Sequence, residues 1–175
     1  GFQQLQDKGV DEVLLVPLYP QYAMSSFETV VVKAMEVQQA YFGEMKITTF
    51  PPFFSNQDYI TVLSKSIAKG LEGFDYDHIL FSYHGIPERH IRKSDPTKFH
   101  CKIDDNCCTT NSVAHHSCYR HQCFATTEKV KAVLGLEEDK TSISFQSRLP
   151  NDPWLKPFTD FEFDKLDEFD EELEN

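Results

Sequence analysis

The chain has 175 residues, of which 40% are apolar and 13% aromatic, enough for one folded domain with a sizeable core. Its formal net charge is −11, and −8 of this comes from the nine acidic residues and one basic residue between Asp160 and Asn175. We expect no nucleic acid partner, because a phosphate backbone requires a basic protein surface, and we interpret the acidic stretch as a solvated helix face.

Short apolar runs alternate with longer segments of helical periodicity. Strands are predicted at residues 12–16, 46–50, 78–83 and 141–145, and helices at residues 26–42, 56–71, 126–134 and 159–173. The alternation predicts an α/β fold, with one lobe over residues 1–175 in which helices cover both faces of a parallel sheet in a Rossmann-like arrangement. Ligands of such sheets bind beyond the carboxyl ends of the strands, where residues 17–22, 83–87 and 146–148 are expected.

Two segments differ in character from the rest of this lobe. Residues 89–122 are polar and rich in cysteine and histidine, and we interpret them as an insertion that needs its own source of order. Residues 160–175 are expected to form an acidic C-terminal helix.

The sequence also predicts a cytoplasmic location. No apolar run approaches the ~20 residues of a membrane span. The first residues lack the charged and apolar regions of a signal peptide. An odd number of cysteines, five, fits poorly with a closed disulfide framework, and thiols stay reduced in the cytoplasm.

One histidine, His84, follows the third predicted strand directly and precedes Gly85 and Pro87. An imidazole there can accept a proton near neutral pH or bind a metal ion. Gly85 would let a flat ligand approach the backbone closely. The alternative is a histidine that only hydrogen-bonds at the end of a strand.

All five cysteines fall within 23 consecutive residues: Cys101, Cys107, Cys108, Cys118 and Cys123. Clustered thiolates can hold a metal ion or an iron–sulfur cluster and thereby order a loop. Zinc would accept four ligands from this set, and the histidines that could substitute are His100, His115, His116 and His121. The spacing lacks the Cys-x2-Cys pairs of zinc ribbons, so it favours an iron–sulfur cluster over zinc, and either over inert thiols. Because Cys107 and Cys108 are adjacent, one of them is a candidate for a surplus thiol.

Planar side chains are expected near the same edge of the sheet. Tyr19 and Tyr22 follow the first predicted strand, and Trp154 lies in the proline-flanked loop after the fourth. Packing in the core is the alternative role for each of these rings.

Several motifs together resemble the ferrochelatases, which insert ferrous iron into a porphyrin in haem synthesis. The motifs are residues 18–22 (LYPQY), 81–87 (FSYHGIP), 145–148 (FQSR), 153–155 (PWL) and 157–160 (PFTD), and the resemblance covers about residues 10–162. Their shared order makes the resemblance specific.

The resemblance implies the following roles for particular residues. His84 would be the active-site histidine that takes pyrrole protons or binds the incoming iron. The substrate, protoporphyrin IX or coproporphyrin III, would contact Tyr19, Tyr22, Ser82, Gln146 and Trp154. The cysteines resemble the internal iron–sulfur segment of some bacterial ferrochelatases, which implies a [2Fe–2S] cluster, with zinc as the alternative; ferrous iron is then a substrate.

The sequence also departs from the family pattern. Ferrochelatases are about twice as long, so the chain is expected to be a central part of one, inactive or weakly active alone. The glutamate that partners the family's histidine is not identified here. The resemblance leaves open peripheral membrane contact in the complete enzyme. Two alternatives remain: a non-catalytic module that binds an iron–sulfur cluster or zinc, and a chelatase for another tetrapyrrole such as sirohydrochlorin.

Overall fold

The computed structural model describes the backbone of residues 1–173 and the side chains of residues 1–166. The chain is organised as two compact units, residues 1–53 and residues 54 onward. The single lobe expected over the whole length therefore stays a prediction. None of the helices within the described residues is long and apolar enough to cross a membrane.

The first unit is a β-α-β arrangement with a short helix in front. Its elements are α1 (Phe2–Gln6), β1 (Glu12–Leu15), the π-helical turn η1 (Met24–Glu28), α2 (Thr29–Tyr41) and β2 (Lys46–Thr49). The strands β1 and β2 pair in parallel, from Glu12 opposite Lys46 to Leu15 opposite Thr49. Helix α2 packs on β2, as expected for a helix that connects two parallel strands.

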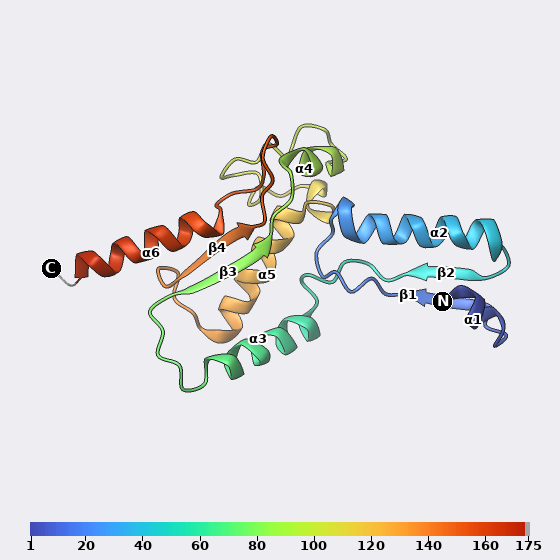
Figure 1. Ribbon diagram of the computed structural model, residues 1–175, viewed down its shortest axis with the longest axis horizontal. Coiled ribbons are helices and arrows are strands. Elements are labelled where there is room, and N and C mark those ends of the chain that lie inside the picture. The colour runs from blue at the N-terminus through green and yellow to red at the C-terminus, as the bar shows by residue number, and fades with distance from the viewer. Residues whose placement is uncertain (174–175) are drawn as a thin grey trace. The chain divides into compact units, whose positions relative to one another are not determined.

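The second unit contains the other parallel pair of strands. Its elements are α3 (Gln57–Leu71), β3 (Ile79–His84), α4 (Glu88–Ser94), the 3-10 turn η2 (Val113–His116), α5 (Tyr119–Leu134), β4 (Thr141–Gln146) and α6 (Thr159–Leu173). Strands β3 and β4 run side by side, and His84 at the end of β3 is paired with Gln146 at the end of β4 (Figure 1).

Helices cover both faces of the β3–β4 pair, as the sequence predicted. On one face the ring of Phe145 lies 6.3 Å from those of Tyr83 and of Phe124 in α5. On the other face the buried Ser144 hydroxyl is 2.8 Å from the hydroxyl of Thr159, the first residue of α6. Alternate side chains of each strand therefore point to opposite faces, as strand geometry requires.

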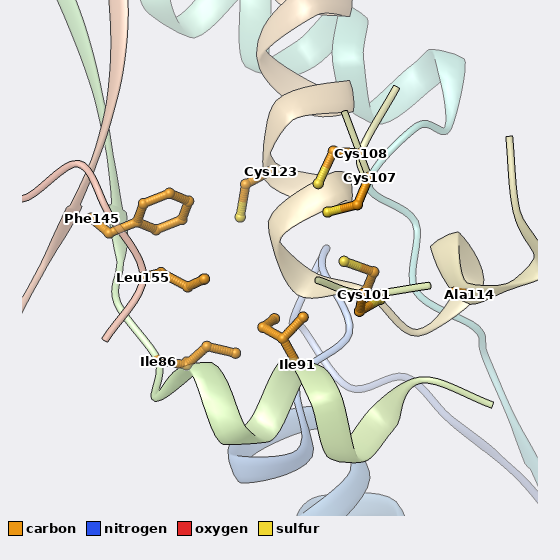
Figure 2. Packing of buried hydrophobic residues seen from close by; sticks show 10 residues of the cluster. Ile86, Ile91, Cys101, Cys107, Cys108, Ala114, Cys123, Phe145 and Leu155 are labelled. Carbon is orange, nitrogen blue, oxygen red and sulfur yellow. The ribbon is translucent and has the colours of Figure 1, made fainter. Parts of the chain in front are cut away.

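The apolar core of the second unit includes the cysteines. Figure 2 shows thiols from Cys101, Cys107, Cys108 and Cys123 in one packed region with Ile86, Ile91, Phe145 and Leu155. The cysteines of this stretch are therefore part of the apolar core of their unit.

Element boundaries differ from the sequence predictions around this stretch. Residues 89–122, expected to be an inserted loop, contain most of α4, η2 and the first turn of α5. Helix α5 begins at Tyr119, earlier than predicted, because the Cys118 Sγ accepts the backbone N–H of His121 at 3.5 Å. A cysteine is an unusual helix cap, since Ser, Thr, Asp and Asn are the common ones. The insertion itself stays a prediction.

The acidic helix predicted at residues 160–175 is present as α6 and is described as far as Leu173. Residues 174–175 lie outside the described residues. The side chains from residue 167 onward also lie outside them, so the interpretation of a solvated acidic face stays a prediction there.

Candidate active site

His84 is the last residue of β3, and its imidazole is exposed at the carboxyl end of the parallel pair. No hydrogen-bond partner contacts this imidazole among the side chains that the structure describes. Gln146, paired with His84 on β4, is also exposed. Ser82, two residues earlier on the same face, is exposed, and its hydroxyl lies 3.1 Å from that of Thr159. Three of the predicted site residues thus share one face.

Gly85 brings the chain close to its neighbours directly after His84. Its backbone N–H donates to the Gln146 carbonyl at 2.7 Å. A Cβ atom at this position would lie 2.6 Å from the same oxygen and 3.5 Å from the Trp154 ring. Real Cβ atoms do not approach a backbone oxygen so closely, so the position requires glycine. The requirement comes from contact with the protein itself, in addition to any contact with a ligand.

The loop that carries Trp154 is fixed along residues 86–88. The N–H of Leu155 donates to the Ile86 carbonyl at 3.1 Å, and the N–H of Glu88 donates to the Pro153 carbonyl at 2.8 Å. Trp154 is half-buried, and its indole N–H is shielded from solvent with no hydrogen-bond partner among the described residues. The Trp154 ring is therefore held in a fixed position next to Gly85, directly after the end of β3.

An ion pair lies beyond the end of β4. The Arg148 guanidinium donates two hydrogen bonds to the Asp160 carboxylate, at 2.6 and 2.7 Å. It also stacks over Phe158, 4.3 Å from the ring centroid. Its hydrogen bonds lower the pKa of Asp160. The pair lines an open cavity of about 360 Å³ that also contacts Gln146 and Thr159.

The two predicted tyrosines belong to the first unit. Tyr19 is exposed, and Tyr22 is half-buried with its ring 5.8 Å from that of Phe27. Burial and a hydrogen bond with Glu28 raise the pKa of Tyr22 to about 12, so it is a neutral phenol at physiological pH. Their place in the site stays a prediction.

Residues 95–123, called the cysteine segment below, are ordered by side-chain hydrogen bonds to the backbone. The buried Asp95 carboxylate accepts the N–H groups of Thr97, His100 and Cys101, at 2.8 to 2.9 Å. The Gln122 amide, fully buried in α5, donates to two carbonyls of η2 at 2.9 and 3.0 Å. These bonds satisfy backbone groups that a loop of this length would otherwise leave unpaired.

Two further hydrogen bonds join Ser94, directly before the segment, to Ser117 within it. The Ser94 hydroxyl donates to the Ser117 carbonyl at 3.0 Å, and the Ser117 hydroxyl donates to the Ser94 carbonyl at 2.7 Å. The C-terminus of α4 is thereby joined to the residue before Cys118.

Four thiols of the segment approach one another in the interior. The thiol of Cys118 interacts with those of Cys101 and Cys108, and the thiol of Cys108 interacts with that of Cys107. None of the five cysteines is disulfide-bonded, and all are at most 7% exposed. The contact with Cys101 raises the pKa of Cys118 to about 12. Burial raises the pKa of Cys107.

Nitrogen donors surround this group of thiols. Arg120 Nη1 donates to Cys107 Sγ at 3.7 Å and to Cys108 Sγ at 3.6 Å. It also donates to the Asp104 carbonyl at 2.7 Å, and the guanidinium stacks on Phe124. Contact with Cys118 and burial raise the pKa of Cys108, and the positive charge of Arg120 partly opposes this rise.

Three of the four histidines of the segment contact backbone carbonyls. Nε2 of His100 and Nε2 of His115 lie 2.7 and 3.0 Å from the Cys107 carbonyl, and Nδ1 of His121 lies 2.8 Å from the Cys108 carbonyl. Because a carbonyl only accepts, each of these nitrogens carries the proton. His115 and His121 are stacked with ring centroids 3.6 Å apart.

The metal-ligand sets expected from the sequence are not decided by this geometry. No group of three or more His, Cys, Asp or Glu side chains within the described part of the chain is arranged so that it could hold a metal ion. The assignment of His84 and the five cysteines as metal ligands therefore stays a prediction.

Sequence reasoning missed one residue of the site, Tyr119. Its hydroxyl donates to the main-chain carbonyl of His84 at 2.9 Å. The two residues are 35 positions apart, and no periodicity or spacing predicts such a contact. An alignment that showed the tyrosine retained together with the histidine would have supplied the signal.

Comparisons with known proteins agree with this architecture. The family model described as ferrochelatase matches residues 1–172. A ferrochelatase of Opitutus terrae is 48% identical over 163 residues, which cover 93% of this chain and 47% of the relative. A ferrochelatase of Ectopseudomonas mendocina is 41% identical over 94% of this chain and 48% of the relative. A ferrochelatase of Stutzerimonas stutzeri is 39% identical over 96% of this chain and 49% of the relative. The chain thus spans about half the length of the curated relatives it matches.

Proposed function

The chain belongs to the ferrochelatase family, and from that membership we propose that the protein inserts ferrous iron into a porphyrin in haem synthesis. One observation carries the proposal to this chain's own residues. The imidazole of His84 is exposed and unpaired among the described side chains, at the carboxyl end of a parallel pair of strands. This edge is where α/β sheets bind their ligands.

His84 is proposed to act as the general base. Metallation replaces two pyrrole N–H protons by Fe²⁺, so both protons must leave the macrocycle. An exposed neutral imidazole can accept one proton, release it to water and then accept the second. Iron enters as the substrate and keeps its oxidation state, so the reaction requires no electron donor.

The surroundings of His84 are proposed to hold the porphyrin. Ser82 and Gln146 lie on the same face as the imidazole and offer a hydroxyl and an amide. The Trp154 ring lies next to Gly85 and offers a planar apolar surface for the macrocycle. Tyr19 and Tyr22 are proposed as further contacts on the strength of the family motif alone. Protoporphyrin IX and coproporphyrin III are the two candidate macrocycles.

The test replaces His84 in the complete protein. His84→Ala is expected to lower kcat for iron insertion at least about 100-fold, the lower end of the range for removal of a general base, while porphyrin binding persists. A matched control is His78→Ala, at the other end of the same strand, where Nε2 of His78 lies 2.9 Å from the Ser142 hydroxyl. Comparable losses in both variants, or full activity in His84→Ala, would contradict the assignment.

Cys101, Cys107, Cys108 and Cys118 are proposed to bind a [2Fe–2S] cluster. A cluster of this type takes four thiolates shared between two irons. The four thiols are buried, Cys118 contacts Cys101 and Cys108, and Cys108 contacts Cys107. N–H donors lie beside the sulfurs, and this donor set fits the group. Zinc is the alternative occupant, since it would take four ligands from the same set of donors. When bound, the cluster would supply structural order.

Cys123 is proposed to be the surplus thiol, in place of Cys107 or Cys108. It is fully buried in α5, where it contacts the Tyr119 hydroxyl. The test is visible absorption with iron and zinc analysis of the anaerobically purified protein. Broad visible bands with about two irons per chain are expected, and they should persist in Cys123→Ser and disappear in Cys118→Ser. Stoichiometric zinc in a colourless protein would overturn the cluster.

The buried thiols favour a second function as well, that of a non-catalytic metal-binding module. A titration of the complete protein with protoporphyrin, coproporphyrin and sirohydrochlorin separates the possibilities. If the protein binds none of the three macrocycles, the result would support the non-catalytic metal-binding module. Preferential binding of sirohydrochlorin would indicate a chelatase for that tetrapyrrole. The cytoplasm is proposed as the location, since five unpaired thiols are typical of a reducing compartment.

A further inference from the structure

The main-chain carbonyl of His84 lies where the β3–β4 ladder ends. The next bond of the ladder runs from the Gly85 N–H to the Gln146 carbonyl, and beyond this point the strands separate. A strand-end carbonyl without a ladder partner must be satisfied by another donor or by water. Here the donor is the Tyr119 hydroxyl, 2.9 Å away.

Tyr119 itself is held on several sides. It is the first residue of α5, directly after the helix cap Cys118, and its ring packs against the core cluster. Its hydroxyl also interacts with the thiol of Cys123, one turn later in the same helix.

We propose that Tyr119 is a positioning residue that fixes the imidazole of His84 through its main-chain carbonyl. The inference rests on the proposed function, because it treats His84 as the base. The backbone of His84 sets the direction of its side chain, since the Cα–Cβ bond follows the peptide planes on either side. Loss of the bond frees the peptide plane between His84 and Gly85 to rotate at the end of the strand.

The first experiment compares two tyrosine variants in the complete protein. Tyr119→Phe removes the hydroxyl beside His84. Tyr83→Phe is the matched control, since its hydroxyl is 2.8 Å from that of Thr127 and its side chain is half-buried in the same core. We expect Tyr119→Phe to lower kcat roughly 10- to 100-fold with KM for the porphyrin within about twofold, as for a misplaced catalytic group. Tyr83→Phe should leave kcat within about threefold. Equal kcat losses in the two variants would reduce Tyr119 to a structural residue and overturn the proposal.

The second experiment does not depend on activity. In protein labelled with carbonyl-¹³C histidine, the His84 resonance is assigned from its loss in His84→Ala. Tyr119→Phe should shift this resonance, and Tyr83→Phe should not. An unshifted resonance overturns the positioning role even if the protein is an active chelatase. A shifted resonance in a protein that inserts no iron leaves the contact intact and refutes the proposed function instead.

Discussion

The buried carboxylate of Asp95 offers the sharpest test of how the cysteine segment is ordered. It is 2% exposed and accepts the N–H groups of Thr97, His100 and Cys101 as well as the Thr97 hydroxyl. In Asp95→Ala, the His100 N–H keeps the Thr97 hydroxyl at 3.1 Å as an acceptor. The other two N–H groups lose theirs, and each costs about 1–3 kcal/mol when it is shielded from water. The variant should therefore lose roughly 2–6 kcal/mol of unfolding free energy.

The assay is urea denaturation followed by the fluorescence of the single tryptophan, Trp154, which lies in the same unit. The matched control is Asp104→Ala. The Asp104 carboxylate also accepts two N–H groups of the segment, those of Asn106 and Cys107, but it is exposed. In Asp104→Ala, water can accept these two N–H groups in place of the carboxylate. The control should therefore lose much less unfolding free energy than Asp95→Ala. Equal losses in both variants would refute the argument that burial makes the hydrogen bonds of Asp95 costly to remove.

The contribution of Asp95 should also depend on pH. Burial alone would raise its pKa, but the hydrogen bonds from Cys101, Thr97 and His100 outweigh burial and lower the pKa from 3.8 to about 2. A depressed native pKa means that the stabilisation is complete above the unfolded value of 3.8 and is lost as the pH falls towards 2. The difference in unfolding free energy between the wild type and Asp95→Ala should therefore shrink between pH 4 and pH 2. A constant difference in unfolding free energy over this range would show that the stabilisation by Asp95 does not depend on its negative charge.

Two further substitutions test the carboxyl end of the strands. Gly85→Ala should destabilise the protein by about 1–3 kcal/mol, because the new Cβ would clash with the Gln146 carbonyl. Gly70→Ala, whose Cβ would have nothing within 4 Å, should be neutral or slightly stabilising. Equal melting temperatures of the two variants would contradict this prediction. Arg148→Gln should raise the pKa of Asp160 towards its ordinary value in a carboxylate ¹³C titration, and an unchanged pKa would mean that the ion pair is not formed in solution.

The parallel strands and the place of His84 could be predicted from the sequence. Apolar runs ending in glycine or proline carry a strong local signal, and the carboxyl ends of parallel strands share an edge. The start of α5 could not be predicted from the sequence, because Cys118 is an uncommon helix cap and the first turn that follows it has no apolar periodicity.

The internal arrangement of the thiols was also beyond the sequence. Spacing alone made adjacent Cys107 and Cys108 the candidates for a surplus thiol, whereas in the structure both accept a hydrogen bond from Arg120 and Cys123 contacts Tyr119. These contacts depend on how α5 packs on β3 and β4, which no local pattern contains.

The reciprocal pair between Ser94 and Ser117 has a consequence for how this protein can vary. The bonds close residues 95–116 into a loop whose two ends are joined by the hydroxyls and carbonyls of the serines. The entropy of closing such a loop grows only with the logarithm of its length, by about 0.6 kcal/mol for each doubling. Residues can therefore be added to or removed from the loop at small cost, while Tyr119 stays directly beyond its base. The junction permits evolutionary change in residues 95–116 without displacing the residue that contacts His84.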